Sequence, residues 1–141
     1  MITLARGAAV CALALAPLSL PATSHAAPPA QLAQRIALTN SDDGHLVTAR
    51  LGDGIEVRLT GYRENGLTWT WSAPASSDST VLRRTAGRTA PNGDASATFQ
   101  AEHAGTATVT AQRSCRPDAG RACPLVITPW KVTVEARQSP S

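Results

Sequence analysis

Polar and apolar residues alternate along most of the chain from residue 36 onward. In one segment Ile55, Val57 and Leu59 take one side of an extended chain, and Glu56 and Arg58 take the other. A period of two residues is typical of strands with one buried and one exposed face. Threonine and valine, which suit a pleated surface, are frequent in these segments. The pattern predicts strands at 36–39, 46–51, 55–60, 67–72, 80–84, 95–102, 106–114 and 125–136.

Turn-forming residues separate these segments. Gly, Asp, Asn and Pro, which favour tight turns, gather at 42–44, 52–54, 91–94 and 104–105. No segment after residue 35 has the spacing of an amphipathic helix. Short strands at regular spacing predict an all-β domain at 36–137, an immunoglobulin-like antiparallel β-sandwich of about seven to eight strands. A small closed barrel is the alternative architecture, and 138–141 form a tail.

The start of the chain has the features of an export signal. A single positive charge precedes an apolar run from Ala8 to about Leu20, and a small-x-small sequence follows at 24–26. The apolar run is too short, and too broken by proline, to span a bilayer as a stable helix. We therefore expect a signal peptide at 1–26 that is cleaved on export, followed by a flexible lead-in at 27–35. The mature protein is then secreted or extracytoplasmic.

The cysteines agree with an oxidising compartment. Cys11 leaves with the signal peptide, so the mature chain keeps Cys115 and Cys123. An even number of cysteines in an exported domain indicates a disulfide. A metal pair or a redox pair is the alternative, but seven intervening residues suit neither.

Size and charge restrict the class of partner. Removal of the signal leaves 115 of the 141 residues, enough for one domain with its own core. The formal net charge is +3, or +2 without Arg6. The arginines are spread along the chain and are not gathered into a block with interleaved aromatics, which argues against nucleic-acid binding.

Catalytic and metal-binding motifs are missing from the sequence. The mature histidines, His45 and His103, lie in or beside predicted turns. The aspartates at 42–43 and Asp53 lack the spacing of a calcium loop and fit turn chemistry better. We expect a non-enzyme without a metal or other cofactor.

Strand parity predicts where the connections lie. If consecutive strands reverse direction, the connections at 60–66, 85–94 and 114–124 share one end of the domain, and the turns at 52–54 and 103–105 lie at the other. Three loops on a rigid scaffold are a common way to build a binding surface. Trp69 and Trp71 share one strand face and are expected in the core, whereas Tyr62 is expected to be exposed.

Two predicted hairpins resemble those of the chagasin family of secreted cysteine-peptidase inhibitors. LVTARLGDGIEVRLT, at 46–60, is similar to that family's early hairpin, with a Gly-Asp turn before an alternating strand that ends in Arg-Leu. ATFQAEHAGTATVTA, at 97–111, resembles a later hairpin with its Gly-Thr-Ala turn. The similarity extends over roughly Ile36 to Ala136 as a pattern of features.

The resemblance also covers parts of the family's three binding loops. Gly66 and Trp69 match the end of its Thr-Gly-Tyr-x-Trp motif, although the Asn-Pro-Thr-Thr start is absent. Residues 91–94 stand where the family has a glycine-rich second loop. The third loop, Arg-Pro-Trp in the family, reads Arg-Pro-Asp at 116–118, with a cysteine on either side.

The resemblance implies a secreted inhibitor-type domain whose loops bind a peptidase cleft without forming a covalent bond. The partner is then a protein, in the family a cysteine peptidase, and no nucleic acid or stable membrane span is expected. The alternative is a generic secreted immunoglobulin-like module that binds a protein without inhibiting it. The predicted partner-binding residues are Tyr62, Asn65, Gly66, Leu67, Asn92, Gly93, Arg116 and Pro117, and the predicted disulfide joins Cys115 and Cys123.

Overall fold

The computed structural model describes residues 7, 9, 11–21 and 32–140, and the chain divides into two units, Met1–Ala30 and Gln31–Ser141. The described residues of the first unit are exposed and form neither helix nor strand. The expected cleavage motif at 24–26, and residues 27–31 of the lead-in expected at 27–35, lie outside the described residues. A search of the described part of the chain for a helix able to cross a membrane gives none.

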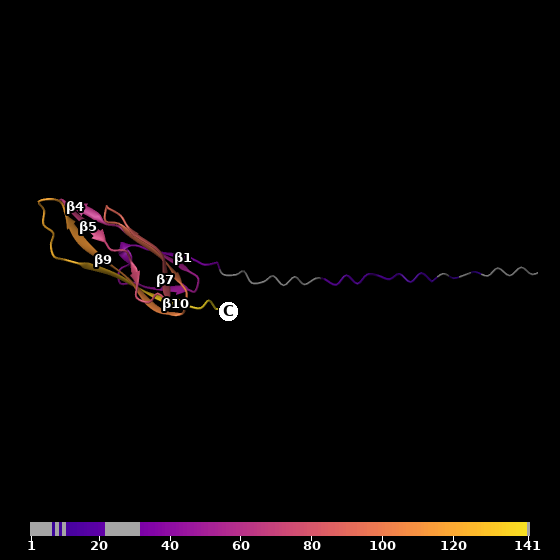
Figure 1. The fold of residues 1–141 in the computed structure, drawn as a ribbon. Coiled ribbons are helices and arrows are strands. Elements are labelled where there is room, and N and C mark those ends of the chain that lie inside the picture. Colours follow the sequence, from indigo (N-terminus) through magenta and orange to yellow (C-terminus); the bar gives the residue numbers. More distant parts are fainter. Residues whose placement is uncertain (1–6, 8, 10, 22–31, 141) are drawn as a thin grey trace, which may run out of the picture. The chain divides into compact units, whose positions relative to one another are not determined.

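The second unit consists of two β-sheets (Figure 1). The first sheet has four strands in the order β1-β3-β8-β7. In chain order they are β1 (Arg35–Leu38), β3 (Gly54–Leu59), β7 (Leu82–Thr89) and β8 (Ala95–Ala101). Alternate residues of β8 are buried throughout, as its period of two requires.

The second sheet has six strands, five of them in the order β2-β10-β9-β5-β4, while β6 pairs with β9. The strands are β2 (Leu46–Arg50), β4 (Tyr62–Glu64), β5 (Leu67–Trp71), β6 (Ala75–Ser76), β9 (Gly105–Pro117) and β10 (Thr128–Arg137). A single 3-10 turn, η1 (Asn40–Asp42), joins β1 to β2 among the described residues.

The core lies between the two sheets. It is built from the apolar positions of the alternating strands, of which Trp130, Phe99, Ile55, Leu59 and Leu82 are the largest that are fully buried. Burial of this apolar surface is the main stabilising contribution to such a domain. The two separate sheets make the domain a sandwich and not the closed barrel that was the alternative.

The predicted strands are all present, but the all-antiparallel arrangement is wrong. β1 runs parallel to β3, and β2 runs parallel to β10. Alternation shows which face of a strand is buried and carries no information on the direction of its neighbour. The strand number is ten and not seven to eight, because the short β4 and β6 were not predicted.

Three strand boundaries also differ from the prediction. β7 continues to Thr89, into the expected second loop, and β9 continues to Pro117, into the expected third. β10 begins at Thr128, so that 125–127 belong to a connection and not to a strand. β7 is exposed at every position after Leu82, and it therefore lacks the alternation that marks a half-buried strand.

The turns at 52–54 and 103–105 lie close together, as strand parity predicts. The Gly52 amide donates to the Ala101 carbonyl at 2.8 Å, and the Glu102 amide donates to the Val81 carbonyl at 2.9 Å. Asp53 is buried there, and its carboxylate accepts the amides of Gln34 and Arg50, each at 2.9 Å. Asp53 thus has the turn role expected from the sequence.

Candidate functional site

The first connection of interest is a hairpin between β4 and β5. Asn65 and Gly66 form its turn with φ values of 52° and 74°. Asn-Gly suits such a turn because both central residues need positive φ. The hairpin carries Tyr62 opposite Trp69, and their rings stack with centroids 5.9 Å apart. The expected open loop at 60–66 is therefore largely an ordered extension of the second sheet.

The second connection is the turn from Ala90 to Asp94. The Asn92 side chain accepts the Asp94 amide at 3.0 Å, which closes the turn. The Gly93 carbonyl accepts the Trp71 amide at 2.9 Å, so this turn pairs with the end of β5. The Asp94 carboxylate also accepts the Gly61 amide at 2.8 Å. The second connection is thus bound directly to the first.

The third connection runs from the end of β9 to the start of β10. Leu67 pairs with Pro117, and Thr68 with Arg116, which places the predicted pair Arg116 and Pro117 beside β5. The Arg116 guanidinium donates to the Pro91 carbonyl at 2.6 Å. This hydrogen bond joins the third connection to the second.

The first and third connections are joined by charge. The Arg63 guanidinium forms an ion pair with the Asp118 carboxylate, and it also donates to the Thr68 hydroxyl at 3.0 Å. The hydrogen bond with Arg63 lowers the pKa of Asp118, and the same contact raises the pKa of Arg63. In addition, the Asp118 amide donates to the Gly66 carbonyl at 3.0 Å.

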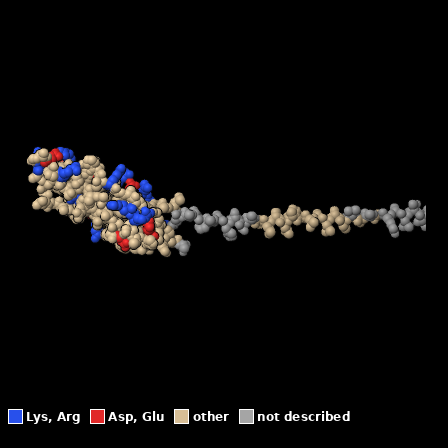
Figure 2. Space-filling view, in the orientation of Figure 1, with Lys and Arg blue, Asp and Glu red and all other residues tan. Residues whose placement is uncertain are grey.

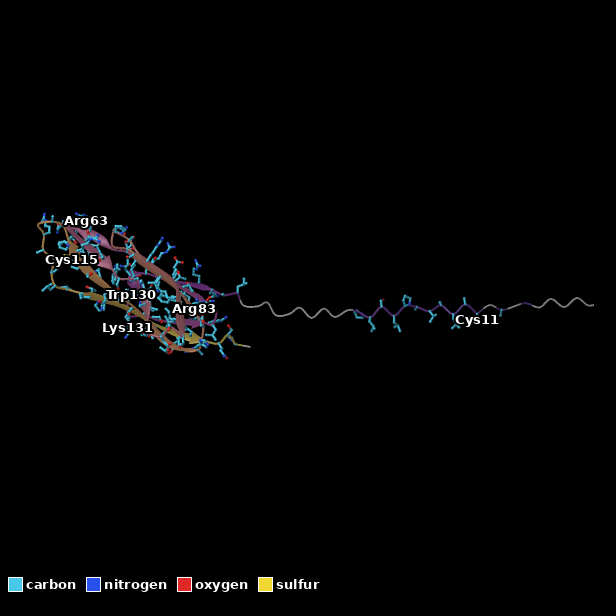
Figure 3. All side chains as sticks on the ribbon, in the orientation of Figure 1. Cys11, Arg63, Arg83, Cys115, Trp130 and Lys131 are labelled. Carbon is cyan, nitrogen blue, oxygen red and sulfur yellow. A yellow bond between two sulfur atoms is a disulfide. The ribbon has the colours of Figure 1, made fainter. Side chains whose placement is uncertain are left out.

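The predicted disulfide is present in this connection. Cys115 and Cys123 are bonded, with their Cα atoms 5.7 Å apart. Cys115 pairs with Trp69 across the β5–β9 ladder. The disulfide therefore fixes the third connection to β9, the strand that pairs with β5 of the first hairpin. Figure 3 shows Arg63 and Cys115 at the same end of the domain.

An arginine lies over the aromatic residues at this end. The Arg113 guanidinium carbon is 5.3 Å from the Tyr62 ring centroid, 5.4 Å from that of Trp69 and 5.6 Å from that of Trp71. Such distances are within the range of cation–π attraction. Trp71 is buried as expected, whereas Trp69 is only half-buried, which corrects its assignment to the core. Sequence reasoning missed the role of Arg113 because it depends on pairing between distant strands.

The third connection ends in three exposed aliphatic residues. Leu125 is 104 % exposed, Val126 53 % and Ile127 62 %. The sequence assigned them to the last strand, since aliphatic residues are typical of strands. Their position after Pro124, which cannot donate to a strand ladder, was the available signal that the strand begins later.

These three connections form one surface, which we call the rim and define as residues 60–66, 90–94 and 114–127. The orange-to-yellow connection of the rim lies beside β4 and β5 in Figure 1. Blue arginine atoms with a few red acidic atoms gather at that end in Figure 2. The structure brings all eight predicted binding residues to the rim or to the strand end that borders it, Leu67.

Possible catalytic groups do not converge in the described part of the chain. His45 lies 3.3 Å from the Asp42 carboxylate in an exposed turn. His103 is 2.8 Å from the Thr80 carbonyl, at another position in the domain. Among the described residues, no three His, Cys, Asp or Glu side chains are grouped so as to hold a metal ion.

Comparison with known proteins gives similarity at the level of structure. No family model and no curated protein matches the sequence. The cysteine protease inhibitor EhICP2 from Entamoeba histolytica matches with 18 % identity over 74 % of this chain and 96 % of its own, at a TM-score of 0.49. PbICP-C, solved in complex with falcipain-2, matches with 11 % identity over 77 % of this chain and 93 % of its own, at a TM-score of 0.41.

A third similar structure is an inclusion body protein from Burkholderia cenocepacia J2315. It matches with 13 % identity over 64 % of this chain and 59 % of its own, at a TM-score of 0.45. All three similarities are at low sequence identity and with a TM-score below 0.5.

Proposed function

We propose that this protein is a secreted inhibitor-type domain that binds a peptidase cleft non-covalently through the rim. The observation that carries the proposal is the bracing between the three connections. Arg63 is paired with Asp118, Arg116 donates to the Pro91 carbonyl, and Gly61 donates to Asp94. A surface held in place before binding loses less conformational entropy on association, which favours tight, reversible binding.

The composition of the rim supports a protein partner. Tyrosine and arginine are enriched at binding hot spots, and both are present here as Tyr62, Arg63 and Arg116. Exposed aliphatic side chains at 125–127 supply apolar area of the kind found at the centre of interfaces. The partner proposed for this surface is a cysteine peptidase of the papain type, which is the target class of the family that the sequence resembles.

Titration of a panel of peptidases tests the proposal. The full chain, exported by an oxidising host and purified, is added to papain-like peptidases and to serine and metallopeptidases. We expect reversible loss of activity that competes with substrate for at least one papain-like enzyme, while the added protein stays intact. Unchanged activity across the panel would contradict the proposed function.

A generic secreted binding module is the second candidate. It is favoured by the third connection, where Asp118 follows Pro117 and is already paired with Arg63. In this case the rim would capture a protein without lowering peptidase activity. Capture of a partner that depends on Tyr62 or Arg116, together with a negative peptidase panel, would identify this alternative.

A further inference from the structure

The outer face of the first sheet is hollowed into a groove of about 870 Å³. This volume is within the range of ligand-binding sites in proteins. Small residues of β7 and β8 line the groove, among them Ala86, Ser96 and Thr98. Long basic side chains of β1, β3 and β7 line it as well, namely Arg35, Arg58 and Arg88. The groove is therefore a polar hollow with arginines around small side chains.

The arginines of the groove are only partly neutralised. Three arginines and two acidic residues line it, which gives a formal charge of +1. The Glu56 carboxylate lies 3.3 Å from the Arg35 guanidinium and is also paired with Arg58. The second carboxylate, that of Asp94, accepts a backbone amide at 2.8 Å and a side-chain amide at 3.1 Å. The Arg88 guanidinium has no ion pair or hydrogen bond with another described residue, so its charge is free for a ligand.

Two of these arginines lie on either side of a serine. Arg58 of β3 and Arg88 of β7 are each directly opposite Ser96 of β8. Residues opposite one another in a sheet lie on the same face, so all three belong to the outer face. Two strand spacings place the Cα atoms of the two arginines roughly 9–10 Å apart. A carboxylate above Ser96 can therefore accept hydrogen bonds from a guanidinium on each side and from the serine hydroxyl.

The groove is continuous with the rim. Pro91 and Asp94 of the second connection belong to the rim and also line the groove. A protein that covers the rim therefore reaches the groove, where its own charge decides whether it makes contact. The shared pairing of Glu56 shows that the arginines of this face bind a carboxylate. None of the described residues that line the groove is aromatic, which argues against a single-stranded nucleic acid, whose bases need stacking partners.

We infer that the groove binds an acidic segment of the protein that the rim engages, with a glutamate or aspartate carboxylate held between Arg58 and Arg88. This inference rests on the proposed function, since the rim supplies the partner, and it adds a second contact of defined charge. Complementary charge beside an interface speeds association and discriminates among partners. Peptidases with an acidic segment beside the cleft should therefore be inhibited faster than those without one.

The test compares Arg88→Glu with Lys131→Glu, which changes the charge equally. Lys131 is exposed on β10, in the other sheet, and is not among the residues that line the groove. The probe is a fluorescein-labelled peptide of alternating glutamate and glycine, titrated with the exported protein at low salt and followed by fluorescence anisotropy. We expect Arg88→Glu to weaken binding at least about fivefold and Lys131→Glu to leave it within about twofold. Ser96→Glu provides a second variant of the groove, and thermal unfolding shows whether each variant is folded.

The outcomes separate the groove from the proposed function. No binding of the peptide by the unchanged protein, or equal weakening by Arg88→Glu and Lys131→Glu, would overturn the inference even where a peptidase is inhibited. Peptide binding that depends on Arg88, together with a negative peptidase panel, would support the acidic ligand and contradict the proposed function alone. Slower association of Arg88→Glu with an inhibited peptidase supports both. A heparin oligosaccharide that binds through Arg88 more tightly than the peptide would assign the groove to a sulfated polysaccharide instead.

Discussion

Two glycines allow neighbouring backbone segments to touch at the rim. A Cβ atom on Gly93 would lie 2.4 Å from the Trp69 carbonyl oxygen, and one on Gly61 would lie 2.5 Å from the Gly93 carbonyl carbon. Gly93 also has a φ of 97°, which side chains other than that of glycine rarely adopt. The contact between the first and second connections therefore depends on these two residues having no side chain.

Gly93→Ala should destabilise the domain more than Gly120→Ala. Both glycines have positive φ, but a Cβ on Gly120 would meet nothing within 4 Å. The comparison therefore separates the effect of the steric contact at Gly93 from the effect of the positive φ, which both glycines share. We expect a difference of about 1–3 kcal/mol in the free energy of unfolding, measured by denaturant titration. Equal destabilisation by the two variants would show that the close approach is not needed.

The ion pair between Arg63 and Asp118 should persist into mild acid. The pKa of Asp118 is lower in the folded chain than in the unfolded chain. Its contribution is therefore complete above the ordinary aspartate pKa of about 3.9 and is lost as the pH falls through the lower folded value. An NMR titration of the carboxyl group should give a lowered midpoint that returns toward the ordinary value in Arg63→Ala. A midpoint that is the same in both proteins would contradict the pairing.

At the scale of elements, the hairpin β4–β5 and the stapled end of β9 form one extension of the second sheet. β5 lies between β4 and β9, so that Tyr62, Trp69 and Cys115 are in register across three strands. Arg113 lies over the aromatic rings of this extension. The rim is therefore built on sheet and disulfide, and not on long free loops.

Removal of the disulfide should loosen the third connection more than the core. In Cys115→Ser/Cys123→Ser the closed loop is lost, which costs about 2–3 kcal/mol in the chain-entropy view. We expect faster hydrogen exchange at 116–127, a lower melting temperature and unchanged protection of β8. Exchange at 116–127 equal to that of the unchanged protein would mean that the staple does not order the rim.

The strands could be predicted from the sequence because half-buried strands alternate visibly, as β3 and β8 do. β7 exceeded its predicted length because its exposed residues carry no alternation, and β4 is too short to show any. The parallel pairing of β1 with β3 depends on contacts between segments far apart in the chain. The sequence therefore predicted the strands of the sandwich well. It predicted poorly which strands pair at the edges of each sheet.

At the scale of the whole domain, the tight turns and the rim lie at opposite ends of the strands. Strand parity predicted that the three connections carrying the eight predicted residues share one end, because reversing strands place alternate connections at one end. Parity could not show that Arg116 reaches the Pro91 carbonyl or that Arg63 meets Asp118, since these contacts depend on strand register and side-chain reach. The exposed segment at 125–127 was missed for another reason, because aliphatic residues are typical of strands.

Arg63→Ala and Arg83→Ala provide a matched pair for the bracing of the rim. Arg63 pairs with Asp118 and Arg83 with Glu102, and their side chains are 59 % and 53 % exposed. Arg83 lies far from Arg63 in Figure 3. Both surface ion pairs should contribute little to global stability. We therefore expect similar melting temperatures for the two variants, and any difference in binding then belongs to the rim.

The inhibition constant of a papain-like peptidase, measured with the unchanged protein and with these two variants, tests the central claim most directly. We predict inhibition by the unchanged protein, about the same inhibition by Arg83→Ala, and inhibition weakened about fivefold or more by Arg63→Ala. No inhibition by any of the three proteins, or equal weakening by both substitutions, would contradict a braced rim that binds a peptidase cleft.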